Sequence, residues 1–386
     1  MQGSQRKHVN FTIVLCILLL TIALTAGCGS GGDCPVTKWN VVIAKVDQNG
    51  NYRWSEVFDS GIANRVTEIV PAPDGGVVIA GYQSTKRSYC SMNLKPRITM
   101  LSGEGKIVWD RFFDVPDIGK TFGMPSCIDI GKAVTIIASR DGGYVTVFNN
   151  GEVVKIDAGG KTIWDTNLNT FSDYWAVTED NNGDIVVAGP SLTKLDAYGN
   201  MVWQRSYPES NKSEVNSISN LKSNDGFLME SLIRGAYVNH RILFSVFDED
   251  GYFIKATQIP QDSNYYQRIL VQRENGYRVY YYDEDLAVHN QTGLLVLDAY
   301  GNLIDRSAVN VTYPLVITND NKSVFTKIVS PYVHVISTDT NQTVEWDCTL
   351  SEEMPVGLFT DRIIETTDGG FVIVYHQYGG TVDLST

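Results

Sequence analysis

An eight-residue pattern that occurs seven times constrains the fold of this 386-residue chain more than any other feature. The copies align without gaps: DQNGNYRW (47–54), SGEGKIVW (102–109), DAGGKTIW (157–164), DAYGNMVW (196–203), DEDGYFIK (248–255), DAYGNLID (298–305) and DTNQTVEW (339–346). Asp opens six copies, Gly holds the fourth position in six, and Trp closes five. The average step between copies is about 49 residues, which is the length of one four-stranded propeller blade.

Each copy has the local chemistry of a β-hairpin. An apolar strand precedes the opening Asp, whose side chain can cap the turn, and Gly supplies the positive φ that a tight turn requires. Five of the seven tryptophans in the chain close a copy, namely Trp54, Trp109, Trp164, Trp203 and Trp346. Because they occupy one equivalent strand position, we expect them to pack between neighbouring blades and not to form a cofactor-binding ring.

A second repeated feature lies between the hairpins, a turn of Asp or Asn with Gly that leads into an apolar strand. Clear examples are DGGVVIAG from Asp74 and DGGFVIVY from Asp368, and a strand precedes each turn. The body opens with the first strand of a hairpin and closes with the strand after the last Gly turn, so neither end completes a blade. We therefore predict that the N-terminal hairpin pairs with the C-terminal strand, with residues 369–375 as the innermost strand of the closing blade.

Together these patterns resemble the PQQ-like and related D-G-G-W tandem-repeat β-propellers of bacterial and archaeal cell surfaces. In that group x-D-G-G-[FY]-[VI]-[VI]-x-G is followed by K-[LVI]-D-x-x-G-[NK]-x-x-W, and the resemblance spans residues 39 to 378. It implies an all-β protein, a single seven-bladed β-propeller of four-stranded antiparallel blades. Because this fold hosts enzymes, scaffolds and binding modules alike, it does not identify a function.

The N-terminus has the features of an export signal. A basic pair (6–7) precedes an uncharged apolar run (11–28), as in a secretory signal peptide. The run ends in LTAGC (24–28), which resembles the lipobox of prokaryotic lipoproteins, where the cysteine is acylated and becomes the new N-terminus. Thr25 stands where that motif usually has Leu. We predict lipidation of Cys28; an uncleaved membrane anchor or cleavage without lipid are the alternatives, and all three place the rest outside the cytoplasm, in the cell envelope.

The sequence thus predicts a signal peptide (1–27), a lipid-anchored flexible tether (28–38) rich in Gly, and the propeller (39–386). Loss of the leader removes two of the 31 basic residues, so 29 remain against 44 acidic residues and the net charge is −15. We find no basic stripe that could follow phosphates, which excludes a nucleic acid partner. The hydrophobic content of 43% excludes disorder for most of the chain.

Four further cysteines follow the lipobox: Cys34, Cys90, Cys127 and Cys348. An even number in an exported chain favours two disulfides. We predict a bond between Cys90 and Cys127, which lie in two long loops on one face of a blade, and a second between Cys34 and Cys348. In the competing interpretation Cys34 is free and Cys348 is buried. Because there is no C-x-x-C element and the histidines are scattered, we expect no zinc site and no other metal site.

No motif in the chain identifies an enzyme. There is no G-x-S-x-G, H-E-x-x-H or phosphate loop. Quinone-dependent dehydrogenases with similar repeats need calcium ligands, often beside an adjacent cysteine pair, which this chain lacks, so we expect no cofactor. A carboxylate pair for glycoside chemistry stays open, because such a pair forms only in space. Strand alternation must point some of Tyr280, Tyr281 and Tyr282 outward, where aromatic rings bind sugars or partners, unless they pack between blades.

We predict a binding or interaction module of the cell surface, held to the membrane by its lipid, that recognises its ligand with loops on one propeller face. The ligand, a protein or a polysaccharide, is open, and we expect a monomer. One alternative is an extracytoplasmic polysaccharide hydrolase or lyase. Another is an envelope assembly scaffold similar to the lipid-anchored propeller of the outer-membrane β-barrel assembly machinery. Carboxylates that converge at one mouth of the channel would favour the enzyme.

Overall fold

A computed structural model of the chain describes residues 36–58, 64–84, 94–115, 134–172, 174–221, 226–233, 241–260, 265–273, 276–283, 292–309, 315–329, 332–350 and 359–382. The chain divides into a unit of Trp39–Tyr378 and a unit of Met1–Lys38 with Gly379–Thr386, the latter lying mostly outside these ranges. All regular elements in the described ranges are strands, and no helix there could cross a membrane.

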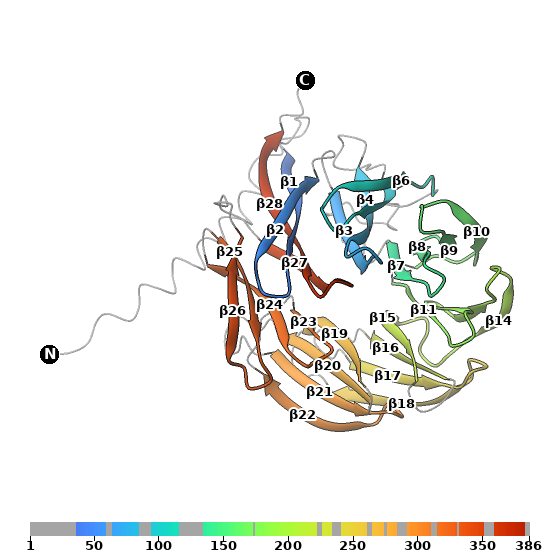
Figure 1. Cartoon of the computed structure of the whole chain (residues 1–386). Coiled ribbons are helices and arrows are strands. Elements are labelled where there is room, and N and C mark those ends of the chain that lie inside the picture. Colours follow the sequence, from blue (N-terminus) through green and yellow to red (C-terminus); the bar gives the residue numbers. More distant parts are fainter. Residues whose placement is uncertain are drawn as a thin grey trace, which may run out of the picture. The chain divides into compact units, whose positions relative to one another are not determined.

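The unit of Trp39–Tyr378 is a β-propeller of seven four-stranded antiparallel sheets arranged around a centre (Figure 1), which confirms the predicted fold class. From the innermost strand outward, blade 1 has β3 (Asn64–Pro71), β4 (Val77–Ser84), β5 (Leu94–Leu101) and β6 (Ile107–Phe112). Blade 2 has β7 (Val134–Ala138), β8 (Tyr144–Phe148), β9 (Glu152–Ile156) and β10 (Thr162–Asn167). Blade 3 has β11 (Ala176–Glu179), β12 (Ile185–Ala188), β13 (Leu192–Leu195) and β14 (Met201–Arg205).

Blades 4 to 6 repeat this order. Blade 4 has β15 (Ser213–Asn220), β16 (Phe227–Ile233), β17 (Arg241–Phe247) and β18 (Phe253–Pro260). Blade 5 has β19 (Tyr265–Arg273), β20 (Gly276–Asp283), β21 (Thr292–Asp298) and β22 (Leu303–Val309). Blade 6 has β23 (Leu315–Ile317), β24 (Ser323–Val329), β25 (Tyr332–Thr338) and β26 (Val344–Thr349).

The closing blade combines both ends of the propeller. Its strands, from the centre outward, are β27 (Phe359–Glu365), β28 (Phe371–Val382), β1 (Val36–Val46) and β2 (Tyr52–Phe58). Closure by the N-terminal hairpin is therefore confirmed, but the prediction that residues 369–375 form the innermost strand is wrong, because residues 371–375 belong to β28, the second strand, and residues 369–370 to the turn before it. The sequence shows which strands are neighbours, yet a long loop can connect two strands of one blade or two blades, so the start of a blade was misplaced by one strand.

Both kinds of repeated turn lie at one end of every blade, because successive strands are antiparallel. We call this end the turn face; it comprises the acid-Gly turns between the first two strands and the Asp-x-x-Gly turns before the outer strand. In the first Asp-x-x-Gly turn, the N–H of Gly50 donates to the carbonyl oxygen of Asp47 at 3.0 Å, and Gly50 has φ +79°. The carboxylate of Asp47 accepts the N–H groups of Asn49 and Asn51 at 2.9 and 2.8 Å.

Each Trp of the pattern lies against the Asp-x-x-Gly turn of the next blade. The indole N–H groups of Trp54, Trp109 and Trp164 donate to the carbonyl oxygens of Gly103, Ala158 and Ala197 at 2.8, 2.9 and 2.9 Å. The turn glycine lies on the indole, and a Cβ added to it would be 2.5–2.8 Å from the ring in the pairs Gly50 and Trp346, Gly105 and Trp54, Gly160 and Trp109, Gly199 and Trp164, and Gly251 and Trp203. The indole of one blade therefore packs directly on the backbone of the turn glycine in the next blade.

Polar contacts join the closing blade to blade 1. Arg362 on β27 pairs with Glu68 on β3 at 3.1 Å. The hydroxyl of Thr367 donates to the carbonyl oxygen of Ala72 at 2.8 Å. These bonds connect residues that are almost 300 positions apart, so they supplement the strand pairing that closes the ring.

Candidate functional site

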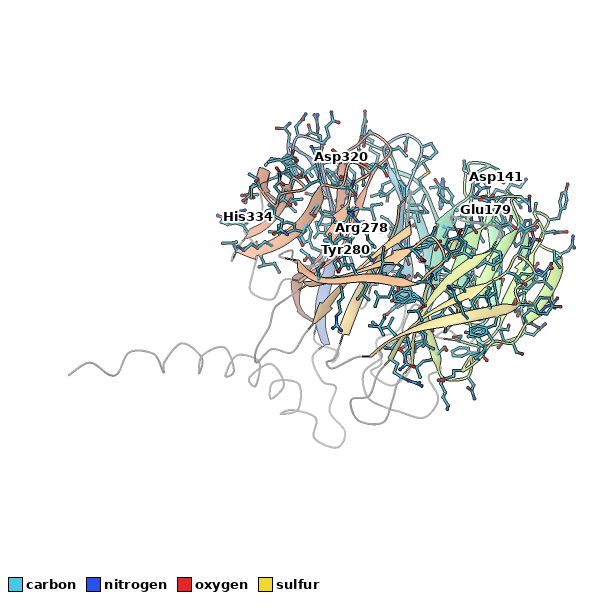
Figure 2. All side chains as sticks on the ribbon, turned by 90° about the horizontal axis from the view of Figure 1, so that it is seen from below. Asp141, Glu179, Arg278, Tyr280, Asp320 and His334 are labelled. Atoms are coloured by element: carbon cyan, nitrogen blue, oxygen red, sulfur yellow. The ribbon has the colours of Figure 1, made fainter. Side chains whose placement is uncertain are left out.

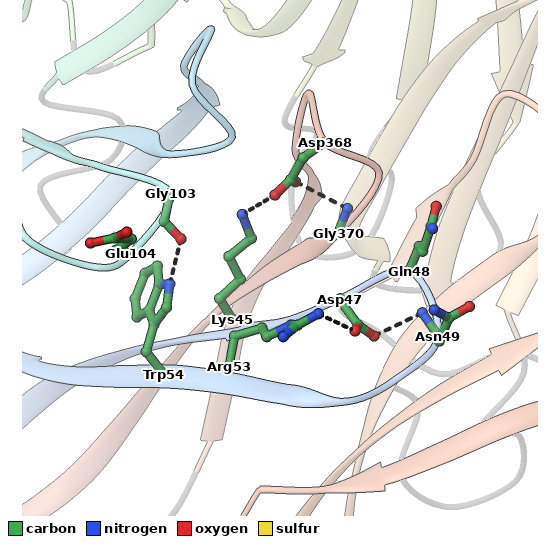
Figure 3. Close-up of a pocket in the computed structure, with 10 residues that line it drawn as sticks. All are labelled: Lys45, Asp47, Gln48, Asn49, Arg53, Trp54, Gly103, Glu104, Asp368 and Gly370. Atoms are coloured by element: carbon green, nitrogen blue, oxygen red, sulfur yellow. Dashed lines mark hydrogen bonds and ion pairs between the residues drawn. The ribbon is translucent and has the colours of Figure 1, made fainter.

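A pocket of about 500 Å³ opens on the turn face between the closing blade and blade 1 (Figure 3). We call it the seam pocket; its lining consists of Lys45, Asp47, Gln48, Asn49, Arg53, Trp54, Gly103, Glu104, Asp368 and Gly370. Strands β1 and β2 and the turn between them supply the first six residues. The Ser-x-x-Gly turn of blade 1 (102–105), equivalent to the Asp-x-x-Gly turns, and the acid-Gly turn of the closing blade supply the other four. The pocket therefore lies where the two ends of the propeller meet.

Lys45 forms a buried side of the pocket. Its side chain is 3% exposed, and its Nζ donates to Asp368 Oδ2 at 2.5 Å and to the carbonyl oxygen of Gly75 at 2.6 Å. Two other blades repeat this pair, with Lys155 bonded to Asp141 at 2.6 Å and Lys194 bonded to Asp180 at 2.8 Å. The charge of Lys45 is thus neutralised within its own blade and serves mainly to hold the acid-Gly turn.

Arg53 brings an accessible cation to the pocket. Trp54 pairs with Lys45 and Tyr52 pairs with Val46, so Arg53 is an extra, bulged residue of β2 and its side chain is 59% exposed. Its guanidinium donates to Asp47 Oδ2 at 2.8 Å (Figure 3). A planar fork of donors is therefore held in place at the pocket by a neighbouring carboxylate.

Two carboxylates of the pocket, those of Asp368 and Asp47, are poor proton donors. Partial burial acts to raise the pKa of Asp368, but hydrogen bonds from Lys45 and Thr366 outweigh it and hold that pKa below its usual value. Burial also acts to raise the pKa of Asp47, but hydrogen bonds from Asn51 and the charge of Arg53 outweigh it and lower that pKa. A general acid for glycoside hydrolysis needs a raised pKa. These two groups instead act as fixed hydrogen-bond acceptors.

The remaining groups give the pocket a mixed hydrogen-bonding surface. Exposed amides of Gln48 and Asn49 can donate and accept, and the exposed carboxylate of Glu104 can accept. Trp54 contributes an indole whose N–H is already bonded to Gly103 (Figure 3). The arrangement can bind a small polar molecule, with amide and guanidinium donors, carboxylate acceptors and the partly buried indole of Trp54.

Sequence reasoning missed this pocket, although one sign of it was visible. In the seventh position of the repeat, five copies have Val or Ile, and Arg53 and Glu345 are the exceptions. The acid-Gly turn that completes the pocket lies more than 300 residues away in the chain, so only the closed ring brings Asp368 to Arg53.

Of the five cysteines with a predicted lipid or disulfide bond, the structure describes Cys348. Cys28, Cys34, Cys90 and Cys127 lie outside the described residues. Cys348 lies on β26, buried against the closing blade, and this burial raises the pKa of its thiol. Both disulfides therefore stay predictions.

Of the three tyrosines predicted as a possible binding surface, the structure describes the side chain of one, Tyr280. Tyr280 on β20, labelled in Figure 2, is buried and packs with Leu315, Ile317 and Phe325 of blade 6. A ligand cannot reach this ring in the folded protein. The side chains of Tyr281 and Tyr282 lie outside the described set. Within that set no three or more His, Cys, Asp or Glu residues gather in a way that could hold a metal ion.

No family model matches the chain, and no curated protein matches it. Among solved structures, BamB from Moraxella catarrhalis is similar at 12% identity and a TM-score of 0.42, over 85% of this chain and 88% of that one. A protein of unknown function from Bacteroides caccae is similar at 10% identity and a TM-score of 0.43, over 81% and 99%. Apo AztD from Citrobacter koseri is similar at 12% identity and a TM-score of 0.40, over 82% and 96%. Similarity at this level assigns no function to the chain.

Proposed function

We propose that this protein is a lipid-anchored binding module of the cell envelope that takes a neutral, hydroxyl-rich ligand of the saccharide class in the seam pocket. The observation that carries the proposal is the convergence of donors and acceptors from three turns beside the indole of Trp54. The repeat pattern further supports placing the chain with the PQQ-like and D-G-G-W propellers. The sequence supports a signal peptide (1–27), a tether (28–38) and an extracytoplasmic location.

The charge balance of the pocket favours a neutral ligand. Lys45 and Arg53 are paired with Asp368 and Asp47, and Glu104 is paired with Lys106 beside the lining, so the charges at the pocket are balanced. An anionic ligand would approach three carboxylates and gain little from the paired cations. An apolar ligand would displace the water that is hydrogen-bonded to these polar groups and would offer no hydrogen bonds in its place. Hydroxyl groups both donate and accept, and they fit this mixture.

Replacing Arg53 with Val tests the pocket. We expect Arg53→Val to weaken saccharide binding roughly tenfold or more, because a charged hydrogen-bond donor is lost. The propeller should fold normally, since Val108 and Val202 occupy the same position in other blades. Titration calorimetry with glucose, galactose, N-acetylglucosamine and their oligomers measures the affinities.

The matched control is Glu345→Val, which replaces the other charged residue of the seventh position, on blade 6 and outside the pocket lining. Its affinity should equal that of the wild type. The proposal fails if no saccharide binds the wild type, or if both variants bind as the wild type does. Tighter binding of galacturonate than of galactose would show that the ligand class is wrong.

The lipid anchor has its own test. We expect the mature chain to begin at a diacylated Cys28 and to partition with membranes, whereas Cys28→Ser should leave the protein in the soluble fraction. Mass spectrometry of the mature N-terminus identifies the modification, and detergent phase separation measures the partitioning. An unmodified N-terminus, with equal partitioning of both forms, contradicts the anchor but leaves the pocket proposal untouched.

A further inference from the structure

Every outer strand contains a β-bulge at the seventh position of the repeat. In each blade the sixth and eighth residues of the pattern pair with consecutive residues of the neighbouring strand, so the seventh has no partner in the ladder. The bulged residues are Arg53, Val108, Ile163, Val202, Ile254, Ile304 and Glu345. A bulge at a sheet edge re-aims a side chain and interrupts strand pairing.

The apolar members of this set are exposed to solvent. Val108, Ile163, Val202, Ile254 and Ile304 are 52–63% exposed, and their outer strands β6, β10, β14, β18 and β22 follow one another around the perimeter in Figure 1. Arg53 and Glu345 show that the fold accepts a charge at this position. The propeller therefore does not require an apolar side chain here for its stability.

Blades 3, 4 and 5 add further exposed apolar groups beside their bulges. The turn tyrosines Tyr198, Tyr252 and Tyr300 are 81%, 56% and 60% exposed. The residues before the bulges are also exposed, namely Met201, Phe253 and Leu303. We call these nine residues of the three blades the apolar rim. Three other blades have an exposed apolar residue at the position before the bulge as well, namely Tyr52, Ile107 and Val344, so the turn tyrosines are what distinguishes blades 3 to 5. Nine exposed apolar side chains on the outer edges of three neighbouring blades are an unusual concentration for a surface that nothing binds.

Carboxylates surround the apolar rim. The three hairpins 196–203, 248–255 and 298–305 contain six acidic residues and one lysine. Glu249, Asp250 and Asp305 are exposed among them. The lysine, Lys255, is bonded to Asn302, and the nearby Arg205 lies over the ring of Tyr252 at 4.8 Å. Even when Lys255, Arg205 and the adjacent Arg306 are counted against the six acidic residues, the charge around the apolar groups is negative.

We propose that the apolar rim binds a basic amphipathic segment of another protein, with apolar side chains on the rim and Lys or Arg beside the turn carboxylates. Charge complementarity selects this occupant. A second copy of this acidic chain would bring like charges together, and an anionic lipid surface would meet the same repulsion. Because the bulges interrupt the strand edge, the contact is made through side chains and not by addition of a strand.

The test uses the full mature chain with Cys28→Ser, so that no lipid competes, and a labelled synthetic peptide of Leu and Lys that forms an amphipathic helix. Val202→Ser/Ile254→Ser/Ile304→Ser should weaken peptide binding about tenfold in fluorescence anisotropy. The matched control Val108→Ser/Ile163→Ser changes equally exposed bulge residues outside the rim and should bind as the wild type does. A peptide with Glu in place of Lys should bind at least about tenfold more weakly.

The dependence of binding on salt and flotation with lipid vesicles complete the test. Added salt should weaken binding of the Lys peptide to the wild type, a result that does not depend on the folding of any variant. Equal binding of the Lys and Glu peptides, or of the triple variant and the wild type, overturns the proposal. Flotation of the wild type but not the triple variant with phosphatidylcholine vesicles, without peptide binding, also overturns it and assigns the rim to lipid.

Discussion

Gly160→Ala is expected to lower the free energy of unfolding by about 3 kcal/mol, the sum of backbone strain and overpacking. Gly160 has φ +79°, and a Cβ there would lie 2.8 Å from the indole of Trp109, which belongs to the previous blade. The new methyl group must displace a ring that is also fixed by its hydrogen bond to Ala158. Urea denaturation measures the loss.

Gly142→Ala is the matched control within the same blade. Gly142 has a similar φ of +85°, but a Cβ there would meet nothing within 4 Å. It should therefore cost only the strain of the left-handed conformation, about 1 kcal/mol. A second check combines Gly160→Ala with Trp109→Ala, in which removal of the ring should cancel most of the extra cost. Equal losses for the two glycine variants would show that the ring and the turn are not coupled.

This contact identifies the group on which each pattern tryptophan packs, which the sequence left open. Gly and Trp recur in each copy, yet they do not contact each other within a copy, because Trp lies against the glycine of the following blade. Each of the five pattern tryptophans precedes a blade with Gly at the fourth position. The one copy without that Gly has Gln342, and it follows the copy that ends in Asp305 instead of Trp. Because the seven copies are equivalent in sequence, only the closed ring shows which neighbouring blade each tryptophan contacts.

The fold could be predicted because hairpin chemistry is local. Asp, Gly and alternating apolar residues specify each turn within eight residues, so strand pairs and blade number followed from the sequence. The start of each blade could not be predicted, since long stretches of sequence separate β4 from β5 within one blade and β6 from β7 across two blades. Whether the strand that follows belongs to the same blade or begins the next one depends on packing between sheets.

The seam pocket and the apolar rim also could not be predicted from local sequence. The pocket depends on Asp368 and Arg53, which closure alone brings together. The rim depends on a register shift that exposes Ile254 and its equivalents, although Val and Ile in a strand predict burial. Local sequence gives residue types, whereas exposure follows from the bulge at the outer edge.

Removal of residues 368–386 is expected to abolish cooperative unfolding. The deletion removes β28, which pairs with both β27 and β1, so the closing blade loses its second strand. Five consecutive buried side chains are lost, namely Phe371, Val372, Ile373, Val374 and Tyr375. At about 2 kcal/mol each, their burial contributes about 10 kcal/mol, comparable with the whole stability of a typical domain. Calorimetry and light scattering should show a broad or absent transition and aggregation.

The control is a shorter deletion, of residues 379–386, which lie outside the unit Trp39–Tyr378. This variant retains the buried part of β28 and the ion pair between Lys45 and Asp368, so its melting temperature should lie within a few degrees of the wild type. The comparison separates closure from a general sensitivity to truncation. A long deletion that melts as sharply and as high as the short one would mean that pairing across the seam does not hold the ring, because exposed edges of β27 and β1 would then be tolerated at no cost.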